Sequence, residues 1–307
     1  MRVRKFETLK PGSLKACALT IGAFDGVHLG HRKIFKTLIS LAKKRKLLAS
    51  AITFQPLPRE VFNNERRGIA ILSFEERKKR IEQAGIELLV VVDFNLKFAQ
   101  KSAGEFMDEL RRKLNPKLIV IGHDFRFGSK KTADECWLRS YCGKMGIELK
   151  VVSAVKVRGE LVSSSRIRSL LKEGDLERAN QLLGEPYQLE GRVIFGHHRG
   201  KKLGFATANL SWSKEPLVPK GVYVARVFYN QRLYPAVVNI GFNPTFGDKK
   251  LNIEAHLLDF KGELYGKRLK ISLLKFLRAE EKFERIEDLV VQIKKDIKRA
   301  RAYLRMR

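Results

Sequence analysis

The residues IGAFDGVHLGH at positions 21–31 decide the fold of the first half of the chain. An apolar, β-rich run at 16–21 leads into them, and a segment with helical periodicity near 31–46 follows. Gly22, Gly26 and Gly30 let the backbone come close to a ligand, and the free N–H groups at a helix start can hold phosphate. The stretch therefore predicts a strand-turn-helix unit placed where open parallel sheets bind nucleotides.

Two histidines in this turn are candidate binding residues. His28 and His31 are three residues apart, with a glycine directly before the second, so both imidazoles can face one ligand. A lone histidine is more often a solvated or capping residue. A pair directly after a predicted strand is much less expected by chance, so the spacing favours a shared ligand site.

The rest of the first half alternates strands with helices. Helical patterns near 74–84, 103–114 and 132–145 separate β-rich runs at 48–54, 87–92, 117–121 and 147–152. This alternation predicts an α/β fold with a parallel sheet and right-handed crossovers. Two short helical segments follow, and the breaker Gly184-Glu185-Pro186 then predicts domains at 1–184 and 185–307.

The second half has a different texture. Turns containing glycine and proline, with no helix, separate β-rich runs at 187–195, 222–229, 234–240, 252–260 and 268–274. Such a run of strands predicts an antiparallel sheet, as a small closed barrel. The last segment, 284–307, repeats apolar residues at helical spacing and predicts a terminal helix with one apolar face.

Composition limits the class of protein. The chain has 307 residues with 44% hydrophobic and 31% charged, which is enough for two packed domains. A net charge of +29 indicates anionic partners: phosphorylated small molecules, nucleic acid or an acidic membrane surface. Three cysteines cannot form a disulfide framework, and neither a membrane-spanning run nor a signal-peptide core is seen, so we expect a cytoplasmic protein without a membrane partner. The basic residues are spread along the chain and no known nucleic-acid-binding motif is present, so we expect no specific nucleic-acid partner.

The turn at 21–31 resembles the histidine-containing signature of nucleotidylyltransferases, which transfer a nucleotidyl group to a phosphorylated substrate and release pyrophosphate. The resemblance implies that His28 and His31 stabilise charge on the phosphates, and that Phe24 and Asp25 bind the nucleotide together with the three glycines. A second motif, SSSRIR at 163–168, opens a helix where serines can cap and Arg168 can hold a phosphate. It resembles the Ser-Ser-Thr-x-Ile-Arg motif of the same superfamily and implies nucleotide binding by Ser164 and Ser165.

A third motif narrows the family. GHDFRFG at 122–128 resembles a loop of prokaryotic FAD synthetases, and the resemblance makes Asp124 a candidate ligand-binding residue. The turn TFQP at 53–56 stands where that family carries a similar turn near its substrate.

The second candidate site is the run GRVIFGHHRGKKLGFATANL at 191–210. Gly196, Lys201 and Gly204 can hold a nucleoside triphosphate through backbone N–H groups and a lysine. The oxygen donors of Thr207 and Asn209 suit Mg²⁺, which prefers hard ligands. We reject a metal site at the tandem histidines 197 and 198, because no third soft ligand is close in sequence.

This run resembles the riboflavin kinase signature, with Ala206 where that family usually has proline. The resemblance continues through 239–247 and 253–260, and it implies that Glu254 is the catalytic carboxylate, although strand alternation alone favours an outward-facing surface residue. LRAEEKF at 277–283 resembles a family segment that borders the flavin, which makes Arg278 a candidate binding residue.

Together the motifs cover nearly the whole chain in the order of the bifunctional prokaryotic riboflavin kinase/FAD synthetases. The resemblance implies a Rossmann-like nucleotidylyltransferase domain with a parallel sheet, followed by a small antiparallel barrel of riboflavin kinase type. Its substrates would be ATP, riboflavin and FMN, with Mg²⁺ as cofactor. The rivals are a cytidylyltransferase of the same superfamily, which the kinase motifs disfavour, and a nucleic-acid-binding protein. The oligomeric state cannot be predicted from the sequence.

Overall fold

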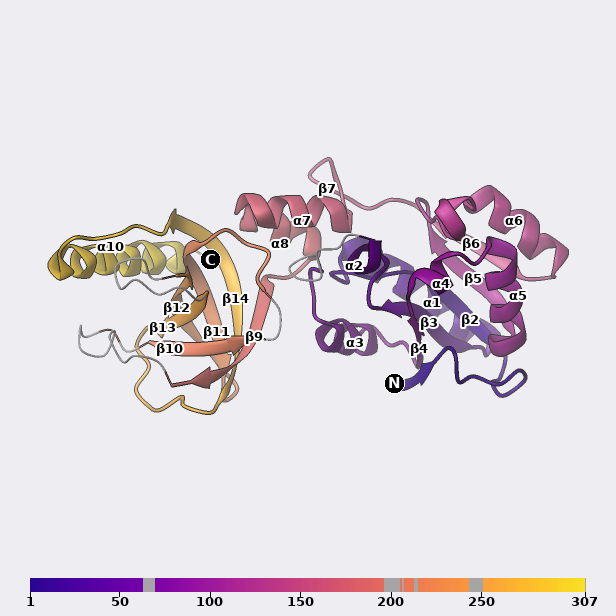
Figure 1. The fold of residues 1–307 in the computed structure, drawn as a ribbon, viewed down its shortest axis with the longest axis horizontal. Helices are drawn as coiled ribbons and strands as arrows, with labels where there is room; N and C mark the ends of the chain where they lie inside the picture. The colour runs from indigo at the N-terminus through magenta and orange to yellow at the C-terminus, as the bar shows by residue number, and fades with distance from the viewer. Residues whose placement is uncertain (63–69, 196–204, 206, 213–214, 243–250, 307) are drawn as a thin grey trace. The chain divides into compact units, whose positions relative to one another are not determined.

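The structure is a computed structural model that describes residues 1–62, 70–195, 205, 207–212, 215–242 and 251–306. The chain divides into two compact units, Met1–Ser164 and Ser165–Arg307 (Figure 1). The predicted parallel sheet and antiparallel barrel are both confirmed. The compact units divide earlier than residue 184, because residues 165–184, which precede the end of the breaker, cluster with the barrel. The predicted limits of the functional domains, 1–184 and 185–307, stay a prediction.

A six-stranded parallel sheet forms the first unit, in the order β1-β4-β3-β2-β5-β6. Five of these strands lie where apolar runs predict them. The strands are β1 (Arg2–Lys5), β2 (Cys17–Ile21), β3 (Leu48–Gln55), β4 (Leu88–Asp93), β5 (Pro116–Gly122) and β6 (Glu148–Val152). Strand β2 is central, and its neighbours β3 and β5 follow it in opposite directions across the sheet. The carboxyl ends of β2 and β5 therefore form the switch point at which open α/β sheets bind ligands.

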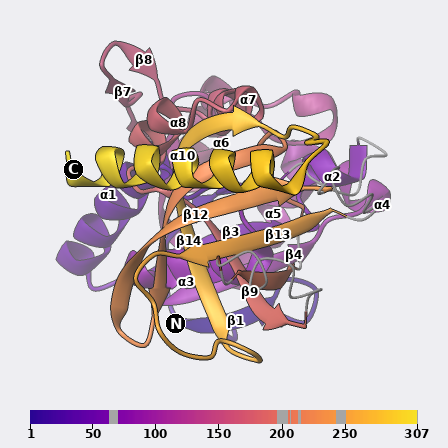
Figure 2. The same ribbon diagram turned by 90° about the vertical axis from the view of Figure 1, so that its left-hand side faces the viewer.

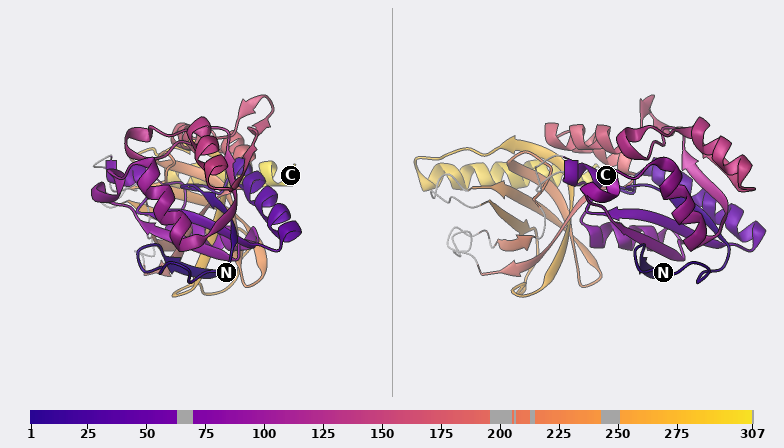
Figure 3. Two further views of the ribbon diagram at one scale, coloured as in Figure 1. Left: turned by 90° about the vertical axis from the view of Figure 1, so that its right-hand side faces the viewer. Right: turned by 45° about the vertical axis from the view of Figure 1, so that its right-hand side comes forward.

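Helices cover both faces of this sheet (Figure 3). Helices α5 and α6 pack their apolar stripes against the face that carries Leu19 and Ile21. Helix α1 contacts β2, β3 and β5, but its buried residues are not part of that cluster, so it lies on the opposite face. The helices are α1 (Leu29–Arg45), α2 (Pro58–Phe62), α3 (Phe74–Gln83), α4 (Leu96–Ala99), α5 (Ala103–Leu114) and α6 (Glu135–Lys144), with a 3₁₀ turn at Ser129–Lys131 and a hairpin of β7 (Lys156–Val157) and β8 (Glu160–Leu161).

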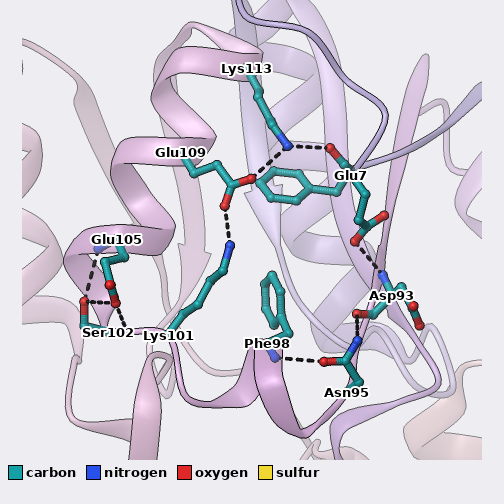
Figure 4. Close-up of polar contacts among 10 residues, drawn as sticks. Glu7, Asp93, Asn95, Phe98, Lys101, Ser102, Glu105, Glu109 and Lys113 are labelled. Atoms are coloured by element: carbon teal, nitrogen blue, oxygen red, sulfur yellow. Dashed lines mark hydrogen bonds and ion pairs between the residues drawn. The ribbon is translucent and has the colours of Figure 1, made fainter.

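Strand β1 is not predicted by any apolar pattern, because all four of its residues are exposed. The residues directly after it fasten it to the sheet and to α5. Phe6 is buried, its N–H donates to Val91, and its carbonyl accepts from Lys113 Nζ at 2.9 Å. Glu7 accepts from the backbone N–H of Asp93 at 3.0 Å, as Figure 4 shows. The strand is therefore held by its backbone pairing with β4 and by the tertiary contacts of the two residues that follow it.

The second unit is a closed barrel whose six strands run in the order β10-β13-β12-β11-β14-β9, all antiparallel. Sequence analysis missed β10, which begins inside the run that was interpreted as one phosphate-binding loop. That strand pairs with both β9 and β13 and so closes the barrel. The strands are β9 (Tyr187–Ile194), β10 (Ala208–Trp212), β11 (Gly221–Tyr229), β12 (Arg232–Gly241), β13 (Asn252–Leu257) and β14 (Arg268–Ala279).

The described residues of the second unit also form the helices α7 (Ser164–Glu173), α8 (Leu176–Leu183) and the predicted terminal helix α10 (Ile286–Arg305). Helix α10 lies across the barrel strands (Figure 2) and buries Ala300 and Tyr303 against Val224 of β11. The side chain of Asn180 helps to join helix α8 to the barrel. Asn180 donates to the carbonyl of Leu273 at 2.9 Å and accepts from the N–H of Tyr187 at 2.7 Å.

We expect Asn180→Ala to destabilise the second unit by about 2 kcal/mol, because two backbone groups lose their partners at a half-buried junction. Unfolding in urea can be followed by the fluorescence of Trp212 in a Trp137→Phe background, which leaves one tryptophan and places it in the barrel. Gln181→Ala, on the same helix, is the matched control. Equal stability of the two variants would contradict the expectation.

Candidate functional sites

The turn between β2 and α1 is held in a conformation that few side chains adopt. Phe24 and Val27 have φ angles of 48° and 43°, and Gly26 has a φ of 87°. A Cβ atom added to Gly22 would lie 2.9 Å from the ring of Phe24, which is itself buried. The predicted need for glycine is thus steric at Gly22 and conformational at Gly26. The buried ring of Phe24 packs against His31 and Phe35 and so fastens the turn to helix α1.

The two histidines lie together at the start of α1. Their rings stack with 3.6 Å between centroids and an angle of 19° between planes. His28 is the N-cap residue, and its Nδ1 atom accepts a hydrogen bond from the backbone N–H of His31 at 3.4 Å. An imidazole that accepts at Nδ1 carries its proton at Nε2 when neutral, so a neutral His28 would have its N–H donor at Nε2.

His31 is kept neutral. Burial lowers the pKa of His31 well below its ordinary value, and the charges of His28 and Arg77 lower it further. Its Nδ1 atom is buried and has no hydrogen-bond partner among the described residues. The stacked imidazoles at a helix N-terminus, where the backbone also presents N–H groups, form an environment suited to a phosphate.

The predicted serine and acidic residues form the base of this turn. Asp25 is buried, and its Oδ1 atom accepts from the N–H groups of Ile71 at 2.8 Å and Leu72 at 3.3 Å. The hydroxyl of Ser164 donates to the carbonyl of Asp25 at 2.7 Å. These contacts order the turn, and binding of a ligand by Asp25 and Ser164 stays a prediction.

Ser165 and Arg168 lie one turn apart on α7. The Nη1 atom of Arg168 is 3.5 Å from the hydroxyl of Ser165, so the two polar groups face the same side of the helix. This is the spacing at which an arginine and a capping hydroxyl can share a phosphate. That role stays a prediction for both residues.

An aromatic surface lies at the carboxyl ends of β3, β4 and β5. Phe125 and Phe127, in the loop after β5, stack with centroids 5.1 Å apart. Their neighbours are other half-buried or buried rings in contact with one another: Phe54, which lies in the selected turn at 53–56, and Phe94, Phe98, Phe106 and Trp137, which sequence analysis did not select. Asp124 is exposed at the end of β5, next to this surface. A row of rings of this kind suits a planar, apolar ligand.

In the barrel, the strand register places three polar residues in one row, two of them predicted from the sequence and one not. Asn209 of β10 and Asn239 of β12 are both the strand partners of Glu254 on β13. Side chains directly opposite each other on neighbouring strands have Cβ atoms about 5 Å apart. Asn239 was not among the predicted site residues, although it lies in a quoted motif, because only the pairing of β12 with β13 brings it beside Glu254.

Along β13 buried and half-buried residues alternate, and Glu254 lies on the face away from the barrel core. Ile253 and Ala255 are buried, whereas Glu254 is half-buried on the other face. That face also carries Asn209, and Thr207 precedes it by two residues, which is one strand period. The hydroxyl, amide and carboxylate oxygens therefore form a set of hard donors that fits Mg²⁺. The predicted residues Gly196, Lys201 and Gly204, and Ala206, lie outside the described residues.

Arg278 is held by helix α10. Its Nε and Nη2 atoms both donate to Oδ2 of Asp296 at 2.9 Å, and its Nη1 atom donates to the carbonyl of Ala279 at 3.0 Å. Asp296 is 2% exposed and also accepts from Gln292. The described contacts of Arg278 are thus structural, and its predicted contact with a ligand stays a prediction.

We expect Asp296→Ala to destabilise the second unit by about 3 kcal/mol, because removal of one partner leaves the Arg278 guanidinium largely desolvated without its counter-charge. Asp288→Ala is the matched control on the same helix. Asp288 pairs with Arg285 in the open, and an exposed pair contributes about 1 kcal/mol or less. The Trp212 fluorescence assay measures both. Equal urea midpoints for the two variants would show that the buried ion pair stabilises the unit no more than the exposed pair.

The sheet places one candidate phosphate site at its switch point, and the barrel carries a second set of polar residues on a separate unit. Fold and sites together define a nucleotide-dependent transferase with two centres. Two family models match the chain in sequence, FAD synthetase over residues 10–166 and Riboflavin kinase over residues 183–304. The chain belongs to the family of bifunctional riboflavin kinase/FMN adenylyltransferases.

Relatives of that description align along nearly their whole length. The protein of Bacillus subtilis is 38% identical over 93% of this chain and 92% of its own length. The protein of Listeria monocytogenes is 35% identical over 93% and 91%, and that of Escherichia coli K12 is 32% identical over 98% and 97%. A crystal structure from Streptococcus pneumoniae, described as a macrolide-efflux protein, superposes with a TM-score of 0.86 at 30% identity, covering 98% of this chain and 99% of that one. Within the part of this chain that the structure describes, no helix is long and apolar enough to cross a membrane.

Proposed function

We propose that the chain converts riboflavin to FMN at the barrel and FMN to FAD at the parallel sheet, using ATP in both steps. The observation that supports this most directly is the presence of both family matches in one chain, each covering one candidate site. The partners are then small molecules: ATP, riboflavin and FMN. The excess of basic residues should attract these anions and make their association rates depend on salt.

In the adenylyl transfer, an oxygen of the FMN phosphate attacks the α-phosphorus of ATP, and pyrophosphate leaves. Negative charge builds on the phosphoryl oxygens in the transition state. We infer that the N–H groups of His28 and His31, with the backbone N–H groups of the helix start, donate to these oxygens. Neutral imidazoles can donate in this way without supplying a proton. The aromatic surface after β5 would stack on the flavin ring.

In the kinase step, the 5′-hydroxyl of riboflavin attacks the γ-phosphorus of ATP, and ADP leaves. We infer that Glu254 accepts the hydroxyl proton or orients the hydroxyl, and that Asn209 and Asn239 fix its carboxylate from the two neighbouring strands. Thr207 and Asn209 would hold Mg²⁺, which supplies charge neutralisation at the phosphates when it is bound.

One assay tests the proposal. The protein is incubated with riboflavin, ATP and Mg²⁺, and riboflavin, FMN and FAD are separated by chromatography over time. We expect FMN first and FAD afterwards, and FAD alone when FMN replaces riboflavin. Omission of Mg²⁺, with a chelator present, should stop both products. If riboflavin gave FMN but neither riboflavin nor added FMN gave FAD, the two-step proposal would be contradicted.

A further inference from the structure

A buried arginine under the histidine turn has no place in the mechanism above. Arg77 lies on α3 and is 1% exposed, which makes it the largest fully buried side chain among the described residues. Its Nη1 atom donates to the carbonyl of Ala23 at 2.9 Å. Its Nη2 atom donates to the carbonyl of Phe54 at 2.7 Å and to the side chain of Gln55 at 2.9 Å. The guanidinium therefore bridges the turn after β2 and the end of β3.

The turn and α3 hold each other from both sides. Oδ1 of Asp25 accepts from the two backbone N–H groups at 71 and 72, just before α3, while Arg77 reaches back to Ala23. The hydroxyl of Thr53 donates to the same carbonyl of Ala23 at 3.2 Å. One carbonyl in the turn thus receives donors from β3 and from α3. Because Phe24 and Val27 have positive φ angles, the turn needs such outside contacts to keep its shape.

Stability alone does not account for a charge at this position. A buried ion costs solvation energy, and apolar residues of similar volume often replace buried charged groups without loss of stability. Arg77 also leaves its own Nε atom without a hydrogen-bond partner among the described residues. The side chain is therefore better explained by what it does to the neighbouring site.

We propose that Arg77 is a positioning residue for adenylyl transfer, holding the turn at 22–30 so that His28 and His31 face the phosphates of ATP. This inference rests on the proposed function of that site. The guanidinium also supplies a fixed positive charge that acts on the imidazole of His31.

That charge acts on the protonation of His31. After burial, the groups that lower the pKa of His31 are His28 from the same turn and Arg77 from α3. Burial lowers the pKa of Arg77 to about 10, while Asp25 and Glu60 act to raise it, so the guanidinium is charged at neutral pH. Loss of the charge would therefore raise the pKa of His31 toward the working range, and His31 would protonate at a higher pH than in the wild type.

The test compares Arg77→Met with Arg77→Lys in the full chain. For Arg77→Met we expect kcat for conversion of FMN to FAD to fall about 100-fold, as a misplaced catalytic group typically causes, with a smaller change in KM for ATP. The acid limb of its pH–rate profile should move to higher pH. Arg77→Lys keeps the charge without the planar fork, so kcat should fall while the acid limb stays in place. FMN formation from riboflavin, at the other site, should be unchanged in both.

Two further variants keep the result interpretable. Lys79→Met removes an exposed cation from the same helix and should behave as wild type. Thr53→Val removes the other donor to Ala23 without changing charge, so it should lower kcat and leave the acid limb unmoved, even if Arg77→Met does not fold. An Arg77→Met protein that forms FMN normally and adenylylates within twofold of wild type would overturn the inference, as would a Thr53→Val protein with unchanged kcat. If the wild type makes no FAD at all, the proposed function fails, and this inference with it.

Discussion

Replacement of both His28 and His31 by alanine should stop FAD formation and let FMN accumulate. The stacked imidazoles are the described side-chain donors at the N-terminus of α1, and they are expected to donate to charge that develops on the phosphates. Loss of one such donor typically costs a factor of about 10²–10³ in rate, so loss of the pair should bring adenylylation to the limit of detection. Chromatography of products from riboflavin and ATP measures the effect.

Lys36→Ala is the matched control, because it removes an exposed cationic donor from the same helix, α1, without entering the pair. The kinase step should continue at its wild-type rate in the double variant, since the barrel carries its own site. Circular dichroism would confirm that the double variant is folded. If FMN formation falls as strongly as FAD formation, the two activities do not reside at separate sites.

Glu254→Gln should produce the reverse pattern. Riboflavin should remain unphosphorylated, while FMN added from outside should still become FAD. A general base contributes a factor of about 10²–10⁴, and glutamine keeps the shape and hydrogen-bonding reach of the side chain without its basicity. The position of Glu254 between Asn209 and Asn239 makes this a test of proton acceptance rather than of folding.

Glu190→Gln, an exposed glutamate on strand β9 of the same barrel, is the control and should have no effect. Kinase turnover within threefold of wild type in Glu254→Gln would show that the carboxylate is an ordinary surface residue of β13, as strand alternation alone suggested. The two experiments together are more informative than either, because only separate sites give opposite product patterns.

The elements that the sequence predicts well are those whose pattern is local. The runs that became β2–β5 are apolar because they are buried in a parallel sheet, and the helix at 286–305 has its own amphipathic repeat. Strand β1 has no such pattern, since its residues are exposed and its anchors, Phe6 and Glu7, come after it. Strand β10 was hidden because its residues were explained by their resemblance to a phosphate-binding run.

Among the candidate site residues, too, only those with a local sequence pattern could be predicted. The spacing of His28 and His31 is local and could be interpreted from the turn alone. Arg77 stands in a run of basic residues, RKKR at 77–80, and nothing in the run distinguishes the one that is buried. Asn239 becomes a site candidate only through its register with β13. Contacts that depend on distant partners require the structure.

The closure of the barrel has a consequence for synthesis of the protein on the ribosome. Strand β9, the first of the barrel to emerge, pairs with β14, which is among the last segments translated, and α10 follows it. Nearly the whole chain must therefore leave the exit tunnel before the barrel can close, whereas the parallel sheet has all its strands once β6 has emerged. During this interval the nascent chain would hold a completed adenylylation unit and an unclosed barrel whose strand edges are unpaired. Ribosomes stalled near the end of the message should thus yield chains in which limited proteolysis cuts the second unit and spares the first.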